Sequence, residues 1–411
     1  MLDIKFIREN AKLVAEKSKQ KGYDIDIEKL LKVDEDRRKF IEEVDQIRSN
    51  RKQAAEARNQ SQGQALKLQA LKSELKEKEN KLEKLQEEYY TLIRQVPNLA
   101  KDDVPVGRDD SENKVKKTVG EKPKFSFTPK DHLDLGLSLG LIDTERASKI
   151  SGTRFAYLKN ELVSLEFALI NYVFDILNKE GFTAIIPPVL VSKKAVAGLG
   201  YPEYENGEGY KVDDQYLVGT AEHSIVPMHM DETFEGSDLP KRYAAFSTAF
   251  RKEAGSYGKD TRGIFRVHQF DKIEMVSFVL PQEEDKELQH LLTLAQKIVS
   301  GLDLPYQIID ICSGDLGFPA SRKYDIEIFM PSQNRYRETH SISTCGDFQS
   351  RRLNIKYKTP KESGYVAILN GTAVAVGRML IAIIENYQQK DGSILVPKIL
   401  QKYTNFNKIP A

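Results

Sequence analysis

Cysteine is scarce in this sequence, and the spacing patterns that bind metal are missing. Only two of the 411 residues are cysteines, Cys312 and Cys345. They cannot form a disulfide framework and they lack metal-ligand spacing, which indicates a reducing compartment. The six histidines form no ligand cluster with them, and His223, His229 and His268 fit ordinary strand or loop positions. We therefore expect no zinc.

Long apolar runs are also absent. The first residues, MLDIKFIRENAKLVAEK, are amphipathic and contain acids, and they lack the apolar core of a secretory signal. No later segment is apolar over the length that a transmembrane helix requires. We expect a cytoplasmic protein.

Neither sign of charge dominates. Lys and Arg number 62 and Asp and Glu 61, so the net charge is +1 and a wholly basic nucleic-acid coat is excluded. A local basic patch is compatible with this balance. Because 411 residues exceed one typical domain, we expect two domains.

Proline and glycine are almost absent from residues 27–96. Apolar residues recur there at alternating spacings of three and four, which is a heptad pattern. The later stripe consists of Leu68, Leu71, Leu75, Leu82, Leu85, Tyr89, Leu92 and Val96, and the earlier one of Leu30, Val33, Phe40, Val44, Ile47 and Ala54. Lys78 interrupts the later stripe, and Arg37 and Arg51 interrupt the earlier one. With the turn-prone NQSQGQ at 59–64 between them, the two halves predict an antiparallel helical hairpin.

The charges near the tip of this hairpin are mostly positive. Between Gln46 and Lys72 the single acid Glu56 opposes a basic set made of Arg48, Arg51, Lys52, Arg58, Lys67 and Lys72. Two interpretations stay open on these residues alone. The tip is the solvated end of a coiled coil, or it contacts a phosphate backbone.

The usual phosphate-binding loops are absent as well. The sequence has no GxxxxGK[ST] and no GxGxxG motif, so neither of the usual nucleotide folds is supported.

Residues 106–125 are polar and contain Pro and Gly, which predicts a linker after an N-terminal domain of residues 1–105. In residues 126–411, apolar helices bracket short strands such as AAFSTAF, QYLVGTAE, GFTAIIPPVLV and KYDIEIFMP. This pattern predicts an α+β domain with an antiparallel sheet.

The stretch FRKEAGSYGKDTRGIFRVHQFDKIE, residues 250–274, predicts a hairpin with a long basic loop. Arg251 and Glu253 extend one strand on the same face, and Phe270 and Glu274 lie on the returning strand. A guanidinium on a sheet face suits a phosphate, and an acid inside an apolar run needs a partner or a function. The alternative is a salt-bridged hairpin in which Arg251 pairs with Glu253 or Glu274.

A second cluster favours the phosphate interpretation. Arg378 stands at the start of an apolar helix, after a strand and a glycine-bearing turn in LNGTAVAVGRML. A cation there opposes the helix dipole, so an anionic partner is expected. Glu338, placed after a strand, and Ser341 offer the hard oxygen ligands that suit Mg²⁺. Arg251 and Arg378 together would clamp a triphosphate.

In these stretches the chain resembles the seryl-tRNA synthetases, class II aminoacyl-tRNA synthetases of the common bacterial and eukaryotic type. The likeness covers the helical arm, TAE at 220–222, FRKEAGSYGKDTRG with HQFDKIEM, and LNGTAVAVGR. The match of FRKEAGSYGKDTRG followed by HQF is highly specific for this family, whereas TAE alone would be weak evidence. The resemblance implies that L-serine is activated with ATP and Mg²⁺ and transferred to tRNA(Ser), with tRNA(Sec) open as a second acceptor.

The resemblance also implies roles for the matching residues. The residues that would bind serine are Thr220, Ala221, Glu222, Arg251, Glu274 and Thr372. The residues that would bind ATP are Arg251, Lys252, Glu253, Phe270, Glu338, Thr339, His340, Ser341 and Arg378. Of these, Glu338 and Ser341 would be the Mg²⁺ ligands. The catalytic residues are Arg251 and Arg378, and the tRNA contacts are Arg48, Arg51, Lys52, Arg58 and Lys67. Pro187 and Pro188 fall in a region that is usually at the interface of a homodimer.

Two short segments depart from the family pattern. SIST at 341–344 has Thr344 where SCSN has asparagine, and HSI follows TAE where Val-Pro-Leu is common. The expected chemistry is attack of the serine carboxylate on the α-phosphate, without a protein nucleophile. The alternatives are a degenerate synthetase-like binding protein and a paralogue that loads an amino acid onto a carrier protein. The intact site residues and the long basic-tipped arm argue against them.

Overall fold

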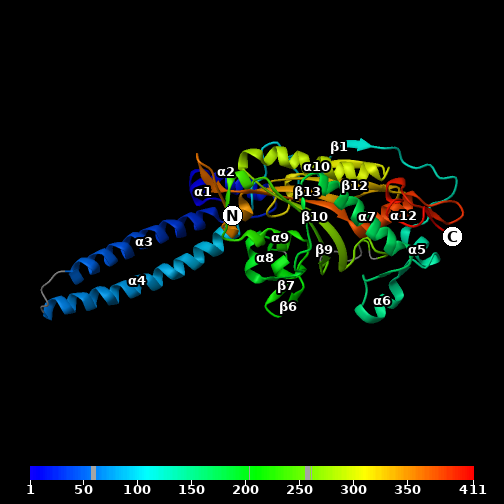
Figure 1. The fold of residues 1–411 in the computed structure, drawn as a ribbon. Coiled ribbons are helices and arrows are strands. Elements are labelled where there is room, and N and C mark those ends of the chain that lie inside the picture. Colours follow the sequence, from blue (N-terminus) through cyan, green and yellow to red (C-terminus); the bar gives the residue numbers. More distant parts are fainter. Residues whose placement is uncertain (57–61, 203, 255–259, 261) are drawn as a thin grey trace. The chain divides into compact units, whose positions relative to one another are not determined.

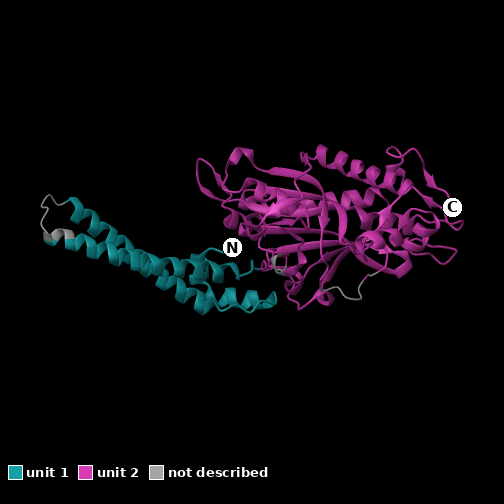
Figure 2. Cartoon of the chain, turned by 90° about the horizontal axis from the view of Figure 1, so that it is seen from below, with its two compact units in different colours: residues 1–99 teal, residues 100–411 magenta. Residues whose placement is uncertain are grey.

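Two long helices dominate residues 1–99, the first of two units in this computed structural model (Figure 2). The structure describes residues 1–56, 62–202, 204–254, 260 and 262–411. Helices α3 (Ile27–Glu56) and α4 (Gln62–Arg94) lie side by side as an antiparallel hairpin (Figure 1). They follow two short helices, α1 (Ile4–Glu9) and α2 (Ala11–Gln20). The predicted helical arm is confirmed.

The heptad residues form the seam of this hairpin. Its buried residues include Leu30, Val33, Val44, Ile47, Leu75, Tyr89 and Val96. Two of the three charged interruptions, Arg37 and Lys78, are accommodated by aromatic rings, and the third, Arg51, is exposed. The Arg37 guanidinium lies 4.2 Å from the centroid of the Tyr89 ring, and the Lys78 ammonium lies 5.1 Å from that of Phe40. Both cations therefore stay in the stripe without burying an unpaired charge.

The turn predicted at 59–64 lies partly outside the described residues. Helix α4 already includes residues 62–64, so the prediction is wrong for these positions. Gly63 stands in the first helical turn, where the amide groups have no intrahelical partner and helix-forming strength matters least. The helix ends at Arg94, close before Pro97, which cannot continue it.

An eight-stranded sheet forms the centre of residues 100–411. Its order is β1-β11-β12-β13-β16-β10-β9-β4, and its neighbours are antiparallel except for β4 and β9. The strands are β1 (Lys114–Val119), β4 (Thr183–Ile185), β9 (Lys241–Phe250), β10 (Gln269–Val279), β11 (Tyr306–Asp310), β12 (Arg322–Met330), β13 (Arg335–Gly346) and β16 (Ala367–Ala375). The predicted α+β class is confirmed.

The two faces of this sheet carry different side chains. Ile273, Met275 and Ile342 belong to the main core, to which α7 (Glu161–Lys179), α10 (Glu284–Gly301) and α12 (Val376–Asn386) contribute. Because side chains alternate along a strand, the intervening residues project to the other face. Part of that face is covered by α8 (Lys193–Leu199), α9 (Glu222–Ile225) and α11 (Phe348–Leu353). The rest lines a polar cavity.

Three local predictions differ from the structure. The segment 106–125, predicted as a linker, contributes β1, whose lysines stand on an exposed sheet edge and resemble loop composition. GFTAIIPPVLV forms two strands, β4 and β5 (Leu190–Ser192), because proline donates no ladder hydrogen bond. QYLVGTAE is a strand only over β7 (Gln215–Leu217), and Glu222 begins α9.

Strand β16 also runs further than predicted. It passes through Gly371 without a turn and continues directly into α12. A Cβ at Gly371 would come within 3.2 Å of the Ile342 side chain on β13, so glycine permits the close approach of these strands. Glu338 lies inside β13 rather than after a strand. Among the described residues, no helix has the length and apolarity needed to cross a membrane.

Candidate active site

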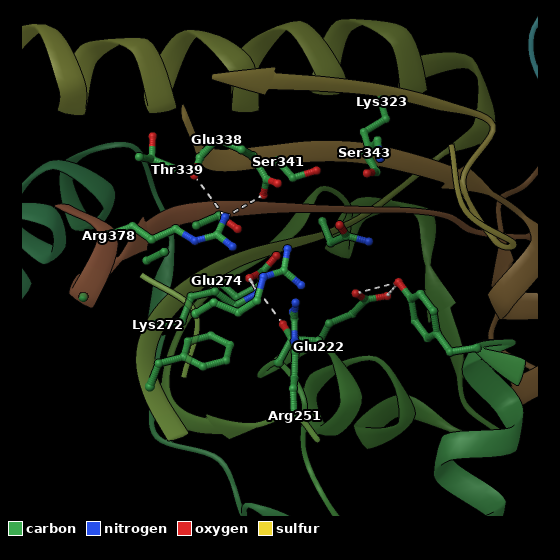
Figure 3. Close-up of a pocket in the computed structure, with 18 of the residues that line it drawn as sticks. Glu222, Arg251, Lys272, Glu274, Lys323, Glu338, Thr339, Ser341, Ser343 and Arg378 are labelled. Carbon is green, nitrogen blue, oxygen red and sulfur yellow. Dashed lines mark hydrogen bonds and ion pairs between the residues drawn. The ribbon is translucent and has the colours of Figure 1, made fainter. Parts of the chain in front are cut away.

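A polar cavity of about 280 Å³ lies on the sheet face that does not join the main core (Figure 3). Side chains from β10, β12, β13 and β16 line it, together with Arg251 just after β9 and the first turn of α12. Of the predicted residues it collects Thr220, Glu222, Arg251, Glu253, Phe270, Glu274, Glu338, Thr339, Ser341, Thr372 and Arg378. The fold thus brings together segments that are far apart in the sequence.

One end of the cavity is defined by Arg378 and Glu338. Arg378 Nη1 donates to the Glu338 carboxylate at 3.1 Å and to its main-chain carbonyl at 3.0 Å. The anionic partner expected for a cation at this helix start is therefore Glu338. Burial alone would raise the pKa of Glu338, but Arg378, with Lys323 and Arg251, holds it below its ordinary value. The hydroxyl-bearing Ser341 follows on the same strand and also faces the cavity.

Arg251 directly follows the last residue of β9. Its Nε donates to the carbonyl of Gly219 at 3.1 Å, and its guanidinium lies 5.3 Å from the centroid of the Phe270 ring. Glu253 has a φ of 52°, so the chain has left the strand and the predicted shared strand face is wrong. Glu253 pairs with Arg266 at 2.6 Å. The alternative in which Arg251 pairs with Glu253 or Glu274 gains no support, because these acids form ion pairs with Arg266 and Lys272.

Glu274 also lines the cavity and is only 3% exposed. Its Oε2 accepts a hydrogen bond from Thr220 Oγ1 at 3.3 Å and forms an ion pair with Lys272 Nζ. Thr372 stands directly across from it in the register of β10 and β16. Burial lowers the pKa of Lys272, while the neighbouring Glu274 acts in the opposite direction.

Glu222 is a second buried acid of the cavity. The hydroxyl of Tyr201 lies 3.0 Å from each of its carboxylate oxygens, and Gln349 Nε2 donates to Oε1 at 2.7 Å. Burial, with a contribution from the negative charge of Glu274, raises the pKa of Glu222 to about 7. A buried carboxylate with this pKa is suited to a cationic ligand, which would restore its charge.

Three predicted residues do not line the cavity. The Ala221 side chain is packed in the smaller core. The Lys252 ammonium lies 5.7 Å from the centroid of the Tyr210 ring. His340 is fully buried, and its Nε2 lies 3.1 Å from the carbonyl oxygen of Ala373. Thr339 borders the cavity, but its hydroxyl donates to the carbonyl of Ile326.

Several residues of the site were not predicted from the sequence. They are Lys272, Tyr201, Gln349, Arg266, Lys323, Ser343, Cys345 and Asn370. Lys272 had a usable signal, because it stands two residues before Glu274 on one strand and therefore shares its face. Tyr201 and Gln349 had none, since helix packing alone brings them to Glu222.

The two departures from the family pattern have structural explanations. Thr344 is fully buried, and its hydroxyl donates to Glu284 of α10 at 2.8 Å, so it points to the core side of the sheet. In HSI, His223 Nδ1 accepts a hydrogen bond from the Gly219 amide at 3.2 Å. Burial lowers the pKa of His223 to about 3, so it is a neutral acceptor.

The basic residues near the arm tip differ in their surroundings. Arg48, Arg51, Lys52 and Lys67 are all exposed, and Arg48 is paired with Glu79 at 2.9 Å. Arg58 lies outside the described residues.

Known proteins match the whole length of the chain. Residues 1–100 match the Seryl-tRNA synthetase N-terminal domain, and residues 208–387 the tRNA synthetase class II core domain (G, H, P, S and T). The chain is 40% identical to the serine–tRNA ligase of Thermodesulfovibrio yellowstonii and covers 100% of both chains. It is 38% identical to that of Nitrosopumilus maritimus, with 99% of this chain and 100% of the relative covered.

Solved structures show the same full-length similarity. Seryl-tRNA synthetase from Pyrococcus horikoshii complexed with ATP superposes with a TM-score of 0.93 at 37% identity, over 100% of both chains. The cytoplasmic serine–tRNA ligase from Naegleria fowleri in complex with AMP gives 0.90 at 30% identity, over 100% of this chain and 99% of that one. The cavity, the helical arm and these full-length similarities lead to one conclusion: the chain belongs to the seryl-tRNA synthetase family.

Proposed function

We propose that this site joins the carboxylate of L-serine to the α-phosphate of ATP, and that the chain then transfers the seryl group to the 3′ end of tRNA(Ser). The observation that carries the proposal is the set of charges that line one cavity, with Arg378 and Glu338 on one side and Glu222 on the other (Figure 3). The cations Arg378 and Arg251 suit a polyphosphate. The buried acids Glu222 and Glu274 suit an amino acid with a polar side chain.

The charges around Glu222 and Glu274 complement serine. The substrate ammonium would bind Glu222 and Thr220, and the substrate carboxylate would bind Arg251. The hydroxyl would meet Glu274, with Thr372 across the strand pair. An alanine substrate would not supply the hydrogen bond that the serine hydroxyl makes to Glu274, and a site built to bind a hydroxyl rejects such an analogue by about 10⁴-fold.

The nucleotide would lie against Phe270, with the Arg378 guanidinium on the other face of the adenine and near the γ-phosphate. Glu253, held by Arg266, would accept a hydrogen bond from the adenine amino group. The cationic side chains of Arg251, Arg378 and Lys323 would surround the phosphates. This placement puts the α-phosphate between the two sides of the cavity, next to the serine carboxylate.

The reaction would need positioning and charge neutralisation rather than a protein nucleophile. A serine carboxylate oxygen forms a bond to the α-phosphorus, the bond to the bridging oxygen breaks, and pyrophosphate leaves with the electron pair. Arg251 would contact both the carboxylate and the α-phosphate, which holds them in line and stabilises the developing charge. A terminal ribose hydroxyl of the tRNA then attacks the activated carbonyl. The bond from that carbon to the phosphate oxygen breaks, AMP leaves with the electron pair, and the hydroxyl proton is lost to water.

The residues at the phosphate end fit a magnesium ion. Glu338 and Ser341 offer a carboxylate and a hydroxyl on one strand, and both face the cavity. Among the described residues no group of three or more His, Cys, Asp and Glu side chains is placed to hold a metal, so ATP and water would complete the shell. When bound, the ion would neutralise charge on the phosphates.

The arm would bind the tRNA. The exposed cations Arg51, Lys52 and Lys67 lie in its outer half, together with Arg48 and the undescribed Arg58. The long variable arm of serine tRNA is the target, and shape and phosphate contacts would dominate over base reading.

The chain would act as a cytoplasmic homodimer. Exposed apolar side chains occur on α7, at Val163 and Phe167, and beside it after β4, at Ile186 and Leu190. Ile186 is 80% exposed, which is unfavourable for an isolated chain in water. Pro187 and Pro188 lie between these residues, and a second copy would cover this surface.

Aminoacylation of tRNA(Ser) with labelled serine tests the whole proposal. The wild-type protein should charge tRNA(Ser) in an ATP-dependent reaction, and the Arg251→Ala variant should not. A protein that binds ATP and tRNA but forms no seryl-tRNA would be a non-catalytic binding protein. Serine found on an added carrier protein instead of tRNA would indicate the carrier-loading alternative.

A further inference from the structure

Lys272 is a buried cation that the proposed reaction does not use. It is 6% exposed, it lines the cavity, and its ammonium forms an ion pair with Glu274 Oε2 (Figure 3). Burying a lysine is costly unless its charge is matched closely. Its position next to the acid that would meet the serine hydroxyl therefore calls for a reason.

The neighbouring charges indicate that reason. The groups that act on Lys272 are Glu274, Glu222 and Arg251. The zwitterionic backbone of the substrate would match two of them, its ammonium with Glu222 and its carboxylate with Arg251. The charge of Glu274 is then balanced by Lys272 alone, so the space for the substrate side chain is polar and has no net charge.

We propose that Lys272 determines specificity: it neutralises Glu274 and thereby excludes amino acids that carry a cation where serine carries a hydroxyl. The proposal rests on the proposed function, since it assumes that the serine hydroxyl meets Glu274. The relevant competitor is 2,3-diaminopropionate, which has the size of serine with an ammonium in place of the hydroxyl. In the wild-type site this ammonium meets a like charge, and without Lys272 it meets an unbalanced carboxylate.

The test compares serine with 2,3-diaminopropionate in ATP–pyrophosphate exchange. Lys272→Met removes the charge and keeps the length of the side chain. The ratio of kcat/KM for serine to that for 2,3-diaminopropionate should fall by at least about a hundredfold. The double variant Lys272→Met with Glu274→Gln is the matched control. Its site has neither charge, so the gain for the cationic substrate should disappear.

The outcomes separate this proposal from the proposed function. A wild-type protein with no serine-dependent exchange refutes the proposed function itself. Wild-type exchange together with an unchanged substrate ratio in a folded Lys272→Met variant overturns the role of Lys272 and leaves it a structural residue. The same holds if the double variant retains the preference for 2,3-diaminopropionate.

A second variant decides the matter if Lys272→Met does not fold. Lys272→Gln removes the charge and keeps a polar group that can donate to Glu274, so the ratio of kcat/KM for serine to that for 2,3-diaminopropionate should fall in the same way. A folded Lys272→Gln variant with the wild-type ratio overturns the proposal.

Discussion

The hydroxyl of Tyr201 lies 3.0 Å from both carboxylate oxygens of Glu222. With Gln349 on the same carboxylate, this contact fixes the plane of the acid that would receive the serine ammonium. Burial of the Tyr201 hydroxyl, next to the negative charge of Glu222, raises its pKa well above the ordinary value. The tyrosine therefore remains a neutral donor at any pH of interest.

Tyr201→Phe tests this contact. A hydrogen bond to a charged group contributes about 1.5–3 kcal/mol, so the KM for serine should rise by roughly 10- to 100-fold. The KM for ATP should stay constant, because Tyr201 does not reach the phosphate end. Equal increases in both constants would mean that the substitution disturbs the whole cavity.

The pH dependence of serine use follows from the raised pKa of Glu222, about 7. The protonated acid cannot pair with an ammonium, so kcat/KM for serine should fall as the pH drops below about 7, by up to tenfold per unit. Glu222→Gln should be less active and should lack this inflection. An inflection that persists in Glu222→Gln would assign it to another group.

The same pKa has a consequence for folding. The pKa of Glu222 is raised in the folded protein, so the folded state binds this proton more tightly than the unfolded chain does. The contribution of Glu222 to stability is therefore present at low pH and declines as the pH rises from the ordinary pKa of 4.5 towards 7. Glu222→Gln should remove this decline, which urea unfolding at several pH values measures.

Arg251→Ala should abolish adenylate formation and leave the fold intact. Removing a charge-assisted interaction with the reacting phosphate costs roughly 10²–10³-fold in kcat. The Arg251 side chain is only partly buried and donates to the main-chain carbonyl of Gly219, so the melting temperature should change little. Near-normal pyrophosphate exchange by the Arg251→Ala variant would show that Arg251 is not a catalytic residue.

The arm should serve transfer to tRNA and not adenylate formation. Deleting residues 41–82 and joining the helices by a short turn keeps Leu30, Val33, Tyr89 and Val96, the buried residues of the base. Pyrophosphate exchange should be unchanged, and the shortened chain should no longer serylate tRNA(Ser). If the shortened chain serylates tRNA(Ser) at the full rate, the arm does not bind the tRNA for transfer.

Neutralising the tip should change the salt dependence of tRNA binding. The variant with Arg51→Ala and Lys52→Ala should lower the slope of log K against log salt by about 0.7–0.9 for each phosphate that it no longer neutralises. Lys39 and Lys81 provide the control, because each is paired with an acid of its own helix, Glu35 and Glu77. Their alanine variants should bind like wild type, and equal effects from both pairs would argue against specific binding by the tip.

The arm and the motif hairpin were predictable because their signals are local. A heptad pattern over residues 27–96 needs no tertiary information, and the charged Arg37 and Lys78 in the stripe are accommodated by rings on the facing helix. One long and specific motif identifies the region around Arg251 and Glu274. Glu274 and Thr372 were both predicted, and the register of β10 and β16 places them opposite each other.

What could not be predicted depends on pairing and packing. Lysines in an edge strand have the composition of a loop, so the residues of β1 predict a linker. Glu253 leaves its strand through a positive φ that no alternation pattern reveals. Tyr201 and Gln349 meet at Glu222 from different segments, and only the packing of α8, α9 and α11 brings them there. Burial of Lys272 beside Glu274 is likewise a property of the folded sheet.

Amino-acid-dependent ATP–pyrophosphate exchange across the twenty standard amino acids tests the central claim most directly. Serine should support exchange. Alanine should do so at least about 10⁴-fold less efficiently in kcat/KM, because Glu274 would lose the hydrogen bond from the serine hydroxyl, and threonine should be excluded by size. Exchange that is equal or faster with another amino acid, or absent with all twenty, would contradict the account.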